Sequence, residues 1–301
     1  MDEKKVLVMM TTYNGENYLD EQLSSLFSQK KVKVKVLVRD DGSSDQTIKI
    51  LNDWQNKEDL NWYTGQHLNT KYGFFDLLEK AIDYNYEFFA FCDQDDVWDD
   101  DKLISAVKEL SCVKNGLEGL YYCGQRLVDE NLNLLSIHEL NEKRTIYARF
   151  LLNDAAGCTQ VFNKPLLKRI IAYKPSYMLM HDAWIVKVCL AVGGKIIVDT
   201  KPHISYRQHT NNVVGLQNNF KSKLKRAQQY IYEQDIESQM RELRNGYGEN
   251  LTPEFGEIIN NILLYKEKNK YKLKLLNLRK FKFGDLGITI TYILKLFLNK
   301  L

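Results

Sequence analysis

The sequence predicts an α/β fold, with a mostly parallel sheet flanked by helices and a helical extension at the C-terminal end. Apolar runs at 6–10 and 88–92 and an alternating run at 32–38 each lead into a polar loop and then into residues with helical spacing. Parallel strands need such crossovers, because the chain must return over the sheet before the next strand begins. A length of 301 residues fits one large domain at 1–215 and an extension at 216–301.

The first unit begins the chain. Residues 6–10 are continuously apolar, which predicts a buried strand, and Asn14 and Gly15 follow in a polar loop. Leu19, Leu23 and Leu26 then recur at helical spacing, so a helix is expected after the loop.

In the second unit, valines alternate with lysines over residues 32–38, which predicts a second strand. The loop 40–45 is made of aspartate, glycine and serine, a composition that a tight turn explains by itself. Ser44 or Asp45 is expected to cap a helix carrying Ile48 and Leu51.

In the third unit, residues 88–92 predict a buried strand that ends at Asp93, Gln94, Asp95 and Asp96. Carboxylate oxygens two residues apart suit Mg²⁺ or Mn²⁺, with a substrate diphosphate completing the coordination. A solvated acidic turn capping a helix at Asp99 is the alternative. Ligands of such sheets bind beyond the carboxyl ends of the strands, so the three loops should share one crevice.

The rest of the chain is less regular. Residues 119–207 are more strand-like, with a turn at Asp129, and helical spacing dominates beyond Gly215. The five cysteines include no CxxC pair, which argues against a disulfide framework and a structural zinc site and favours a reducing cytoplasm. The apolar run at 6–10 is shorter than the core of a signal peptide, so no export is expected.

The loops at 11–16, 40–45 and 93–96, in this order and spacing, resemble the nucleotide-binding half of glycosyltransferase family 2. Members of that family have the Rossmann-like GT-A fold. The motifs at 92–98, 181–184 and 206–215 resemble the rhamnosyltransferase-like branch, which builds bacterial surface polysaccharides. The resemblance covers about residues 1 to 215.

The resemblance implies a donor site for a nucleoside-diphosphate sugar. Asp41 would accept a hydrogen bond from the base, and a glycine in the small-residue loop 155–159 would allow the donor sugar to approach closely. The donor-binding residues expected are Thr11, Tyr13, Asn14, Glu16, Asp41, Asp93, Gly157 and Arg207. The metal, Mn²⁺ or Mg²⁺, would be held by Asp95 and Asp93, with His209 as a third ligand.

Asp182 is the candidate catalytic base. A sugar hydroxyl is a poor nucleophile at neutral pH, so a carboxylate must take its proton as the new bond forms. The sequence around His181, Asp182 and Trp184 resembles the family's base motif. The structural alternative is that Asp182 is the N-cap of the helix that follows, and the two roles are compatible.

The C-terminal extension has a different composition. Residues 261–301 carry a net charge of +8, which leaves −5 for the first 260 residues. Apolar residues interleave with the basic ones at 266–282, and 286–298 is mainly apolar but too short to span a bilayer. Such a segment suits an amphipathic helix on anionic lipid or a helix-pairing surface. The alternative is a helix packed on the parent domain with a solvated basic face.

The expected function is inverting, metal-dependent transfer of a sugar, with L-rhamnose as a candidate, from a dTDP or UDP donor to a lipid-linked saccharide. The enzyme would work at the cytoplasmic face of the membrane, in cell-surface polysaccharide biosynthesis. A sugar-phosphate nucleotidyltransferase is an alternative, but the loop 11–16 has no basic residue for a triphosphate. A catalytically inactive scaffold of the same fold is the second alternative. Nucleic-acid binding is not expected, because the body of the chain is acidic.

Overall fold

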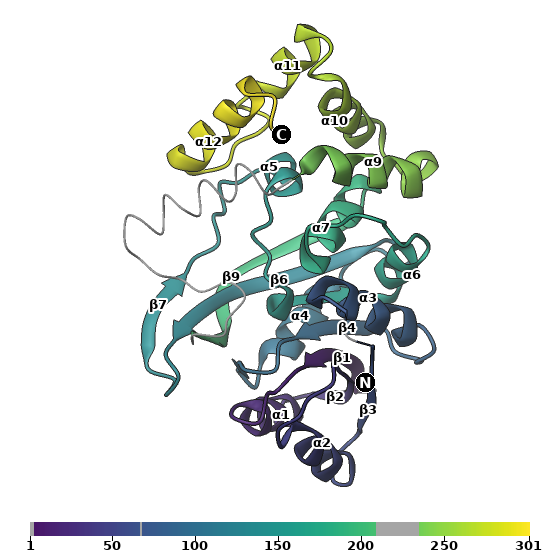
Figure 1. The fold of residues 1–301 in the computed structure, drawn as a ribbon, viewed down its shortest axis with the longest axis vertical. Coiled ribbons are helices and arrows are strands. Elements are labelled where there is room, and N and C mark those ends of the chain that lie inside the picture. Colours follow the sequence, from purple (N-terminus) through teal and green to yellow (C-terminus); the bar gives the residue numbers. More distant parts are fainter. Residues whose placement is uncertain (1–2, 67, 209–234) are drawn as a thin grey trace.

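The computed structural model describes residues 3–66, 68–208 and 235–301. It confirms the α/β class: one nine-stranded sheet runs in the order β3-β2-β1-β4-β8-β6-β9-β5, with β7 paired to β6. Helices cover the sheet, and further helices extend from one end of it (Figure 1).

The N-terminal half of the sheet is parallel. Strand β1 pairs with both β2 and β4, and β2 pairs with β3, all in parallel. The strands are β1 (Lys4–Thr12), β2 (Val32–Asp40), β3 (Leu60–Thr64) and β4 (Phe88–Cys92), and the helices between them are α1 (Leu19–Phe27), α2 (Thr47–Gln55) and α3 (Thr70–Ala81). The strands at β1, β2 and β4 and the helices α1 and α2 are as expected from the sequence, whereas β3 and α3 were not predicted.

The second half of the sheet is mixed. Strand β8 runs antiparallel to β4 and β6, and β9 runs parallel to β6. Its strands are β5 (Val97–Trp98), β6 (Gly119–Val128), β7 (Leu134–His138), β8 (Gln160–Asn163) and β9 (Lys195–Arg207), and its helices are α4 (Lys102–Ser111), α5 (Ile146–Leu151), α6 (Lys164–Ile171) and α7 (His181–Ala191), with a 3₁₀ turn η1 (Gly157–Thr159).

The central strands β1 and β4 are buried on both faces. In β1, Val6 and Val8 pack into one hydrophobic core, and Leu7 and Met9 pack into another on the opposite face. Alternate residues of a strand point to opposite faces, so a strand covered on both sides must be apolar throughout. This explains why residues 6–10 form an uninterrupted apolar run.

Two expected helix caps differ from the structure. Helix α4 begins at Lys102 after Asp101, and Asp99 instead forms an ion pair with Arg126, so the cap at Asp99 is wrong. At α2 the N-cap is Gln46, although the Asp45 carboxylate accepts the Thr47 backbone N–H at 3.0 Å.

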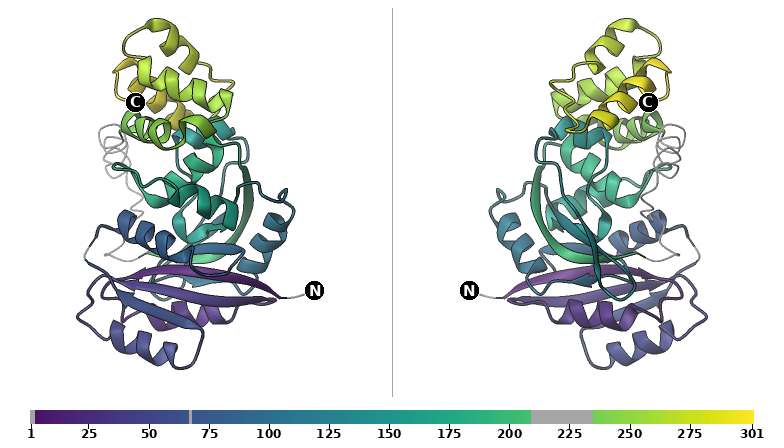
Figure 2. Two further views of the ribbon diagram at one scale, coloured as in Figure 1. Left: turned by 90° about the vertical axis from the view of Figure 1, so that its right-hand side faces the viewer. Right: turned by 90° about the vertical axis from the view of Figure 1, so that its left-hand side faces the viewer.

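The C-terminal helices form a second tier at one end of the molecule (Figure 2). They are α9 (Ile236–Tyr247), α10 (Pro253–Leu264), α11 (Asn269–Leu275) and α12 (Leu286–Phe297), with a 3₁₀ turn η2 (Gly248–Asn250) after α9. Their buried side chains, such as Phe255 and Tyr292, belong to the same hydrophobic core as Phe150 of α5 and Trp184 of α7. The expected boundary at 215/216 lies outside the described residues. None of the helices described has both the length and the apolar character needed to cross a membrane.

Candidate active site

Hydrogen bonds join the three loops that follow β1, β2 and β4. The Tyr13 backbone N–H donates to the Gln94 side chain at 2.9 Å, which ties the first loop to the acidic loop. The Asn14 N–H donates to the Ser43 hydroxyl, and the Asn14 side chain accepts the Ser44 N–H, each at 2.9 Å. Asn14 lies in the left-handed region with φ of 47°, a conformation that asparagine tolerates better than most residues. The sheet therefore brings the three loops to one edge, as expected.

These loops form the floor of a pocket of about 880 Å³. Most of the expected site residues line it: Thr11, Tyr13, Asn14, Asp41, Asp93, Asp95, Gly157 and Asp182. The opposite wall comes from the segment before β8 and from the N-terminal turn of α7. Among the described lining residues there is no lysine or arginine.

Two expected site residues lie elsewhere than in the lining of the pocket, and a third lies outside the described residues. Glu16 does not line the pocket, and its carboxylate accepts the Gln46 backbone N–H at 2.8 Å. Arg207 is buried behind the acidic loop, where its Nε donates to the Asp95 carbonyl at 2.9 Å and its backbone N–H donates to Asp96 at 3.1 Å. Arg207 thus holds the acidic loop in place in this structure. His209 lies outside the described residues.

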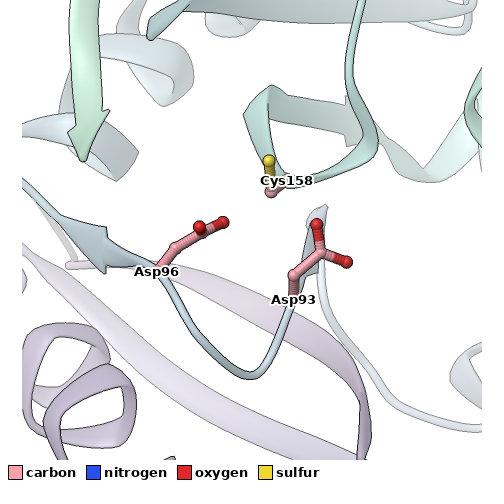
Figure 3. Close-up of side chains that lie close together, drawn as sticks. All are labelled: Asp93, Asp96 and Cys158. Carbon is pink, nitrogen blue, oxygen red and sulfur yellow. The ribbon is translucent and has the colours of Figure 1, made fainter. Parts of the chain in front are cut away.

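The acidic loop meets the segment before β8 at the pocket. Ligand atoms of Asp93, Asp96 and Cys158 all lie within 4.8 Å of one another, and Figure 3 shows the three side chains converging. Burial, together with the neighbouring charges of Asp95 and Asp182, raises the pKa of Asp93 to about 7. Burial and the charges of Asp93 and Asp95 also raise the pKa of Asp96 well above its usual value. The carboxylates are therefore crowded enough to repel one another.

A divalent cation would relieve this repulsion. Asp96 is fully buried, and its Oδ2 has no hydrogen-bond partner among the described residues, so a bound cation would satisfy this oxygen. Carboxylate oxygens suit Mn²⁺ or Mg²⁺. Burial raises the pKa of the Cys158 thiol well above its usual value, so it is not a nucleophile at neutral pH. The carboxylates fit a hard cation, while Asp96 and Cys158 were not expected beside it.

Asp182 lies in the first turn of α7, close enough to Asp93 to raise the pKa of that residue. Its Oδ2 accepts the Gly157 N–H at 3.1 Å and its Oδ1 accepts the Ala183 N–H at 2.5 Å. The N-cap of α7 is Met180, so the expected capping role of Asp182 is wrong: the helix begins one residue before it. Burial raises the pKa of Asp182 to about 6, although these N–H groups and the Asn153 side chain favour the charged form.

His181 is buried beside Asp182. Its ring stacks on Phe74 with centroids 4.0 Å apart and meets Phe91 edge-on, and neither ring nitrogen has a hydrogen-bond partner in the described part of the chain. Burial lowers the pKa of His181 to about 3. A Cβ on Gly157 would lie 2.7 Å from the His181 Nε2, so a glycine is needed there. His181 therefore packs beneath the small-residue loop as a neutral side chain.

The chain is similar to known glycosyltransferases. Residues 7–169 match the model of Glycosyl transferase family 2. The dTDP-rhamnosyl transferase RfbG of Shigella flexneri is 31% identical over 237 residues, which are 72% of this chain and 77% of that protein. The UDP-Glc:alpha-D-GlcNAc-diphosphoundecaprenol beta-1,3-glucosyltransferase WfgD of Escherichia coli is 30% identical over 170 residues, 56% of this chain and 63% of that protein.

Solved structures share the fold. The TarS 1–349 structure from S. aureus in complex with UDP-GlcNAc aligns with a TM-score of 0.59 at 20% identity, covering 97% of this chain and 79% of that chain. The mannosyltransferase PcManGT of Pyrobaculum calidifontis, in complex with GDP-Man and Mn²⁺, aligns with a TM-score of 0.58 at 18% identity, covering 98% of this chain and 86% of that chain. The fold is the GT-A fold, as expected from the sequence.

Proposed function

Because the chain belongs to glycosyl transferase family 2, we propose that it moves a sugar from a nucleoside-diphosphate donor to a lipid-linked saccharide, with inversion at the anomeric carbon. The observation that carries the proposal is the shared pocket. It contains the expected nucleotide-binding loops, the acidic loop and the expected base, Asp182, from four separate segments of the chain. Such a set of groups is what a single displacement at a donor sugar requires.

Asp182 acts as the general base. With a pKa of about 6 its carboxylate is mostly ionised at neutral pH, and it is basic enough to accept a proton from an acceptor hydroxyl. The N–H groups of Gly157 and Ala183 orient the carboxylate. One base acting in one displacement, without a second nucleophile, gives inversion. After proton transfer the neutral acid is tolerated, because burial already favours that form.

Binding an anionic diphosphate in this pocket needs a cation. Asp93, Asp95 and Asp182 all line it, and the described lining contributes no lysine or arginine to offset them. Mn²⁺ or Mg²⁺ held by Asp93 and Asp95 would neutralise the diphosphate and stabilise the charge that develops on it as it leaves. His209 remains the proposed third ligand. The structure of PcManGT, described as a complex with Mn²⁺, supports this choice of metal.

The donor and acceptor are proposed from the relatives. The name of RfbG specifies a dTDP-rhamnosyl transferase, which supports dTDP-L-rhamnose as the donor, with a UDP-sugar as the alternative. The name of WfgD specifies a diphosphoundecaprenol-linked acceptor, which supports a lipid-linked saccharide here and a role in surface polysaccharide assembly. We expect the reaction to take place at the cytoplasmic face of the membrane.

A nucleotidyltransferase remains a weaker candidate. Its triphosphate substrate would carry more negative charge into a pocket whose described lining is acidic. An inactive scaffold is disfavoured because Asp93, Asp95 and Asp182 are all present and all line the pocket.

Because the proposed acceptor is linked to a lipid, we propose that α12 binds the membrane surface. Leu286, Ile290, Leu294 and Phe297 lie at successive turns of this helix and are between 48% and 76% exposed. Other apolar residues of the extension, including Phe281 and Phe283, are buried in the core. Basic residues dominate the extension, so an exposed apolar stripe there fits an anionic lipid surface.

The membrane role is tested best by substitution in α12. Deleting residues 261–301 would also expose the core that Phe281 and Phe283 share with the sheet domain. We expect Ile290→Ser with Leu294→Ser to weaken binding to vesicles containing anionic lipid, and added salt to weaken binding of the unchanged protein. Leu273→Ser on α11, at a residue that is 68% exposed, is the control. Equal binding by the α12 variant and the control would reject the role of α12.

The transfer proposal is tested with a donor panel. Purified protein is incubated with UDP-, dTDP- and GDP-sugars, with and without Mn²⁺, and its melting temperature is recorded. A donor that binds the native state raises the melting temperature, and the rise should need the metal. The donor found in this way is then supplied with a lipid-linked saccharide, and NMR of the product should show an inverted anomeric centre. The proposal fails if no nucleotide sugar shifts the melting temperature or if the product retains the donor configuration.

A further inference from the structure

The C-terminal extension contacts the segment between β7 and α5. The Asn141 side chain donates to the Gly284 carbonyl at 2.8 Å, and the Nε of Arg144 donates to the Phe283 carbonyl at 3.0 Å. Both carbonyls lie just before Asp285, the N-cap of α12. These hydrogen bonds therefore attach the beginning of α12 to the sheet domain.

Arg144 also reaches the wall of the pocket. Its Nη1 donates to Oδ2 of Asp154 at 2.7 Å, and Asp154 lines the pocket. Arg149 donates to the same oxygen, and the Tyr122 hydroxyl donates to Oδ1 at 3.1 Å. The side chains of Arg144 and Asp154 are only 9% and 7% exposed, and a hydrogen bond shielded from water in this way is stronger than one at the surface. One guanidinium thus connects the extension to the pocket.

Asp154 belongs to the segment that orients the proposed base. Burial raises the pKa of Asp182 to about 6, and hydrogen bonds from the Asn153 side chain and the Gly157 backbone N–H act against this effect. The hydrogen bond from Gly157 to Oδ2 of Asp182 is 3.1 Å long. Residues 153–157 therefore hold Asp182 at two points, and Asp154 attaches these residues to Arg144.

We propose that Arg144 is a positioning residue for the general base: through Asp154, it keeps the segment 153–157 where that segment can orient the Asp182 side chain. The inference rests on the proposed function, in which Asp182 accepts a proton from the acceptor hydroxyl. A base must lie within hydrogen-bond reach of that hydroxyl, and a displacement of about 1 Å can cost about 100-fold in rate. The C-terminal extension, which supplies one partner of Arg144, then contributes to the geometry of the active site.

A double-mutant cycle tests whether Arg144 acts through Asp182. Turnover is measured for the unchanged protein, Arg144→Gln, Asp182→Asn and the double variant. Arg144→Gln alone should lower turnover at least about 5-fold, because the base is then less well oriented. In the Asp182→Asn background the same substitution should lower turnover less than about 2-fold. The base is already absent there, and the effects of residues that act as a unit do not multiply.

Binding of a nucleoside diphosphate distinguishes positioning of the base from general damage to the pocket. The proposed nucleotide-binding loops follow β1, β2 and β4, whereas Arg144 contacts Asp154 and Phe283. The dissociation constants of UDP and of deoxythymidine diphosphate, measured with Mn²⁺ by calorimetry, should therefore change less than about 2-fold in Arg144→Gln. Lysine offers one donor group in place of the guanidinium fork, so Arg144→Lys should restore part of the lost turnover.

Arg169→Gln is the matched control. Arg169 of α6 forms an ion pair with Glu118 at 2.9 Å and does not line the pocket. This substitution should leave turnover unchanged. If Arg144→Gln does not fold, Arg144→Lys takes its place in the cycle, with a smaller loss of turnover that should again depend on Asp182.

Each outcome decides the inference. It is overturned if Arg144→Gln loses less than about 5-fold in turnover, if Arg144→Lys in its place loses nothing, or if Arg169→Gln loses as much. A loss of about 2-fold or more in the Asp182→Asn background, or an equal weakening of nucleoside diphosphate binding, would also overturn it. These results leave the proposed sugar transfer intact, because the unchanged protein is active. If the unchanged protein transfers sugar from none of the donors, the proposed function and the inference fail together.

Discussion

Replacing Asp182 with asparagine separates the chemistry of this side chain from its structural contribution. The carboxylate accepts N–H groups from Gly157 and Ala183 on its two oxygens. Asparagine offers one oxygen and an NH₂ group, so one of these hydrogen bonds is lost, at a cost of about 1–3 kcal/mol.

The burial of the charge works in the opposite direction. A pKa of about 6 in the folded protein, against about 3.9 in the unfolded chain, means that the ionised carboxylate costs about 3 kcal/mol at pH 7. Asparagine removes that cost because it is neutral. The two effects are of similar size and opposite sign, so the free energy of unfolding of Asp182→Asn should stay within about 2 kcal/mol of the original value.

The chemical effect should be much larger. General-base catalysis contributes about 10²- to 10⁴-fold, so turnover should fall by that factor. Donor affinity should largely remain, since the proton moves only when the acceptor attacks. Turnover, donor affinity and urea unfolding are measured on one preparation, with Asp199→Asn as a control. Asp199 accepts a hydrogen bond from Tyr121 at 2.7 Å and does not line the pocket. If Asp182→Asn keeps more than about a tenth of turnover with chemistry rate-limiting, Asp182 is not the base.

Three further predictions follow from the same site. Because Asp182 must be ionised to act, kcat/KM should rise about tenfold per pH unit below about pH 6 and level off above it, and a profile that is flat from pH 5 to 7 would contradict this. Asp95→Ala should abolish the Mn²⁺-dependent rise in melting temperature with donor while leaving the ligand-free melting temperature nearly unchanged, and a persisting rise would reject Asp95 as a ligand. Burial lowers the pKa of His181 to about 3, so between pH 7 and pH 5 only the unfolded chain takes up a proton at this residue. Lowering the pH from 7 to 5 should therefore reduce the free energy of unfolding of the original protein by about 2 kcal/mol more than that of His181→Leu, measured by urea unfolding. An equal pH dependence of the two proteins would show that His181 does not titrate in this way.

Some parts of the fold can be predicted from short stretches of sequence. The apolar runs of β1 and β4 and the alternating valines of β2 reflect whether one or both faces of a strand are covered, and this pattern is local. The polar loops after these strands could be predicted for the same reason. Strand β3 escaped prediction because Leu60 is its only buried residue. Strand β5 has only two residues and is defined by its pairing with β9.

Other parts of the site depend on contacts between distant residues. Cys158 lies beside Asp93 and Asp96 only because β8 pairs with β4 in the sheet. Arg207 was expected to bind phosphate because it is an arginine. The pairing of β9 with β6 and β5 instead places its guanidinium against the Asp95 carbonyl.

By itself, the sequence determined the fold class and the three loops at the edge of the sheet, and its resemblance to the family made Asp182 the candidate base. Each depends on residue types and spacing within a short segment. Only the tertiary structure decided which carboxylates crowd together, that Asp182 lies inside a helix whose N-cap is Met180, and that α12 leaves an apolar stripe exposed. Electrostatic shifts and burial are sums over neighbours from the whole chain, so no local pattern can specify them.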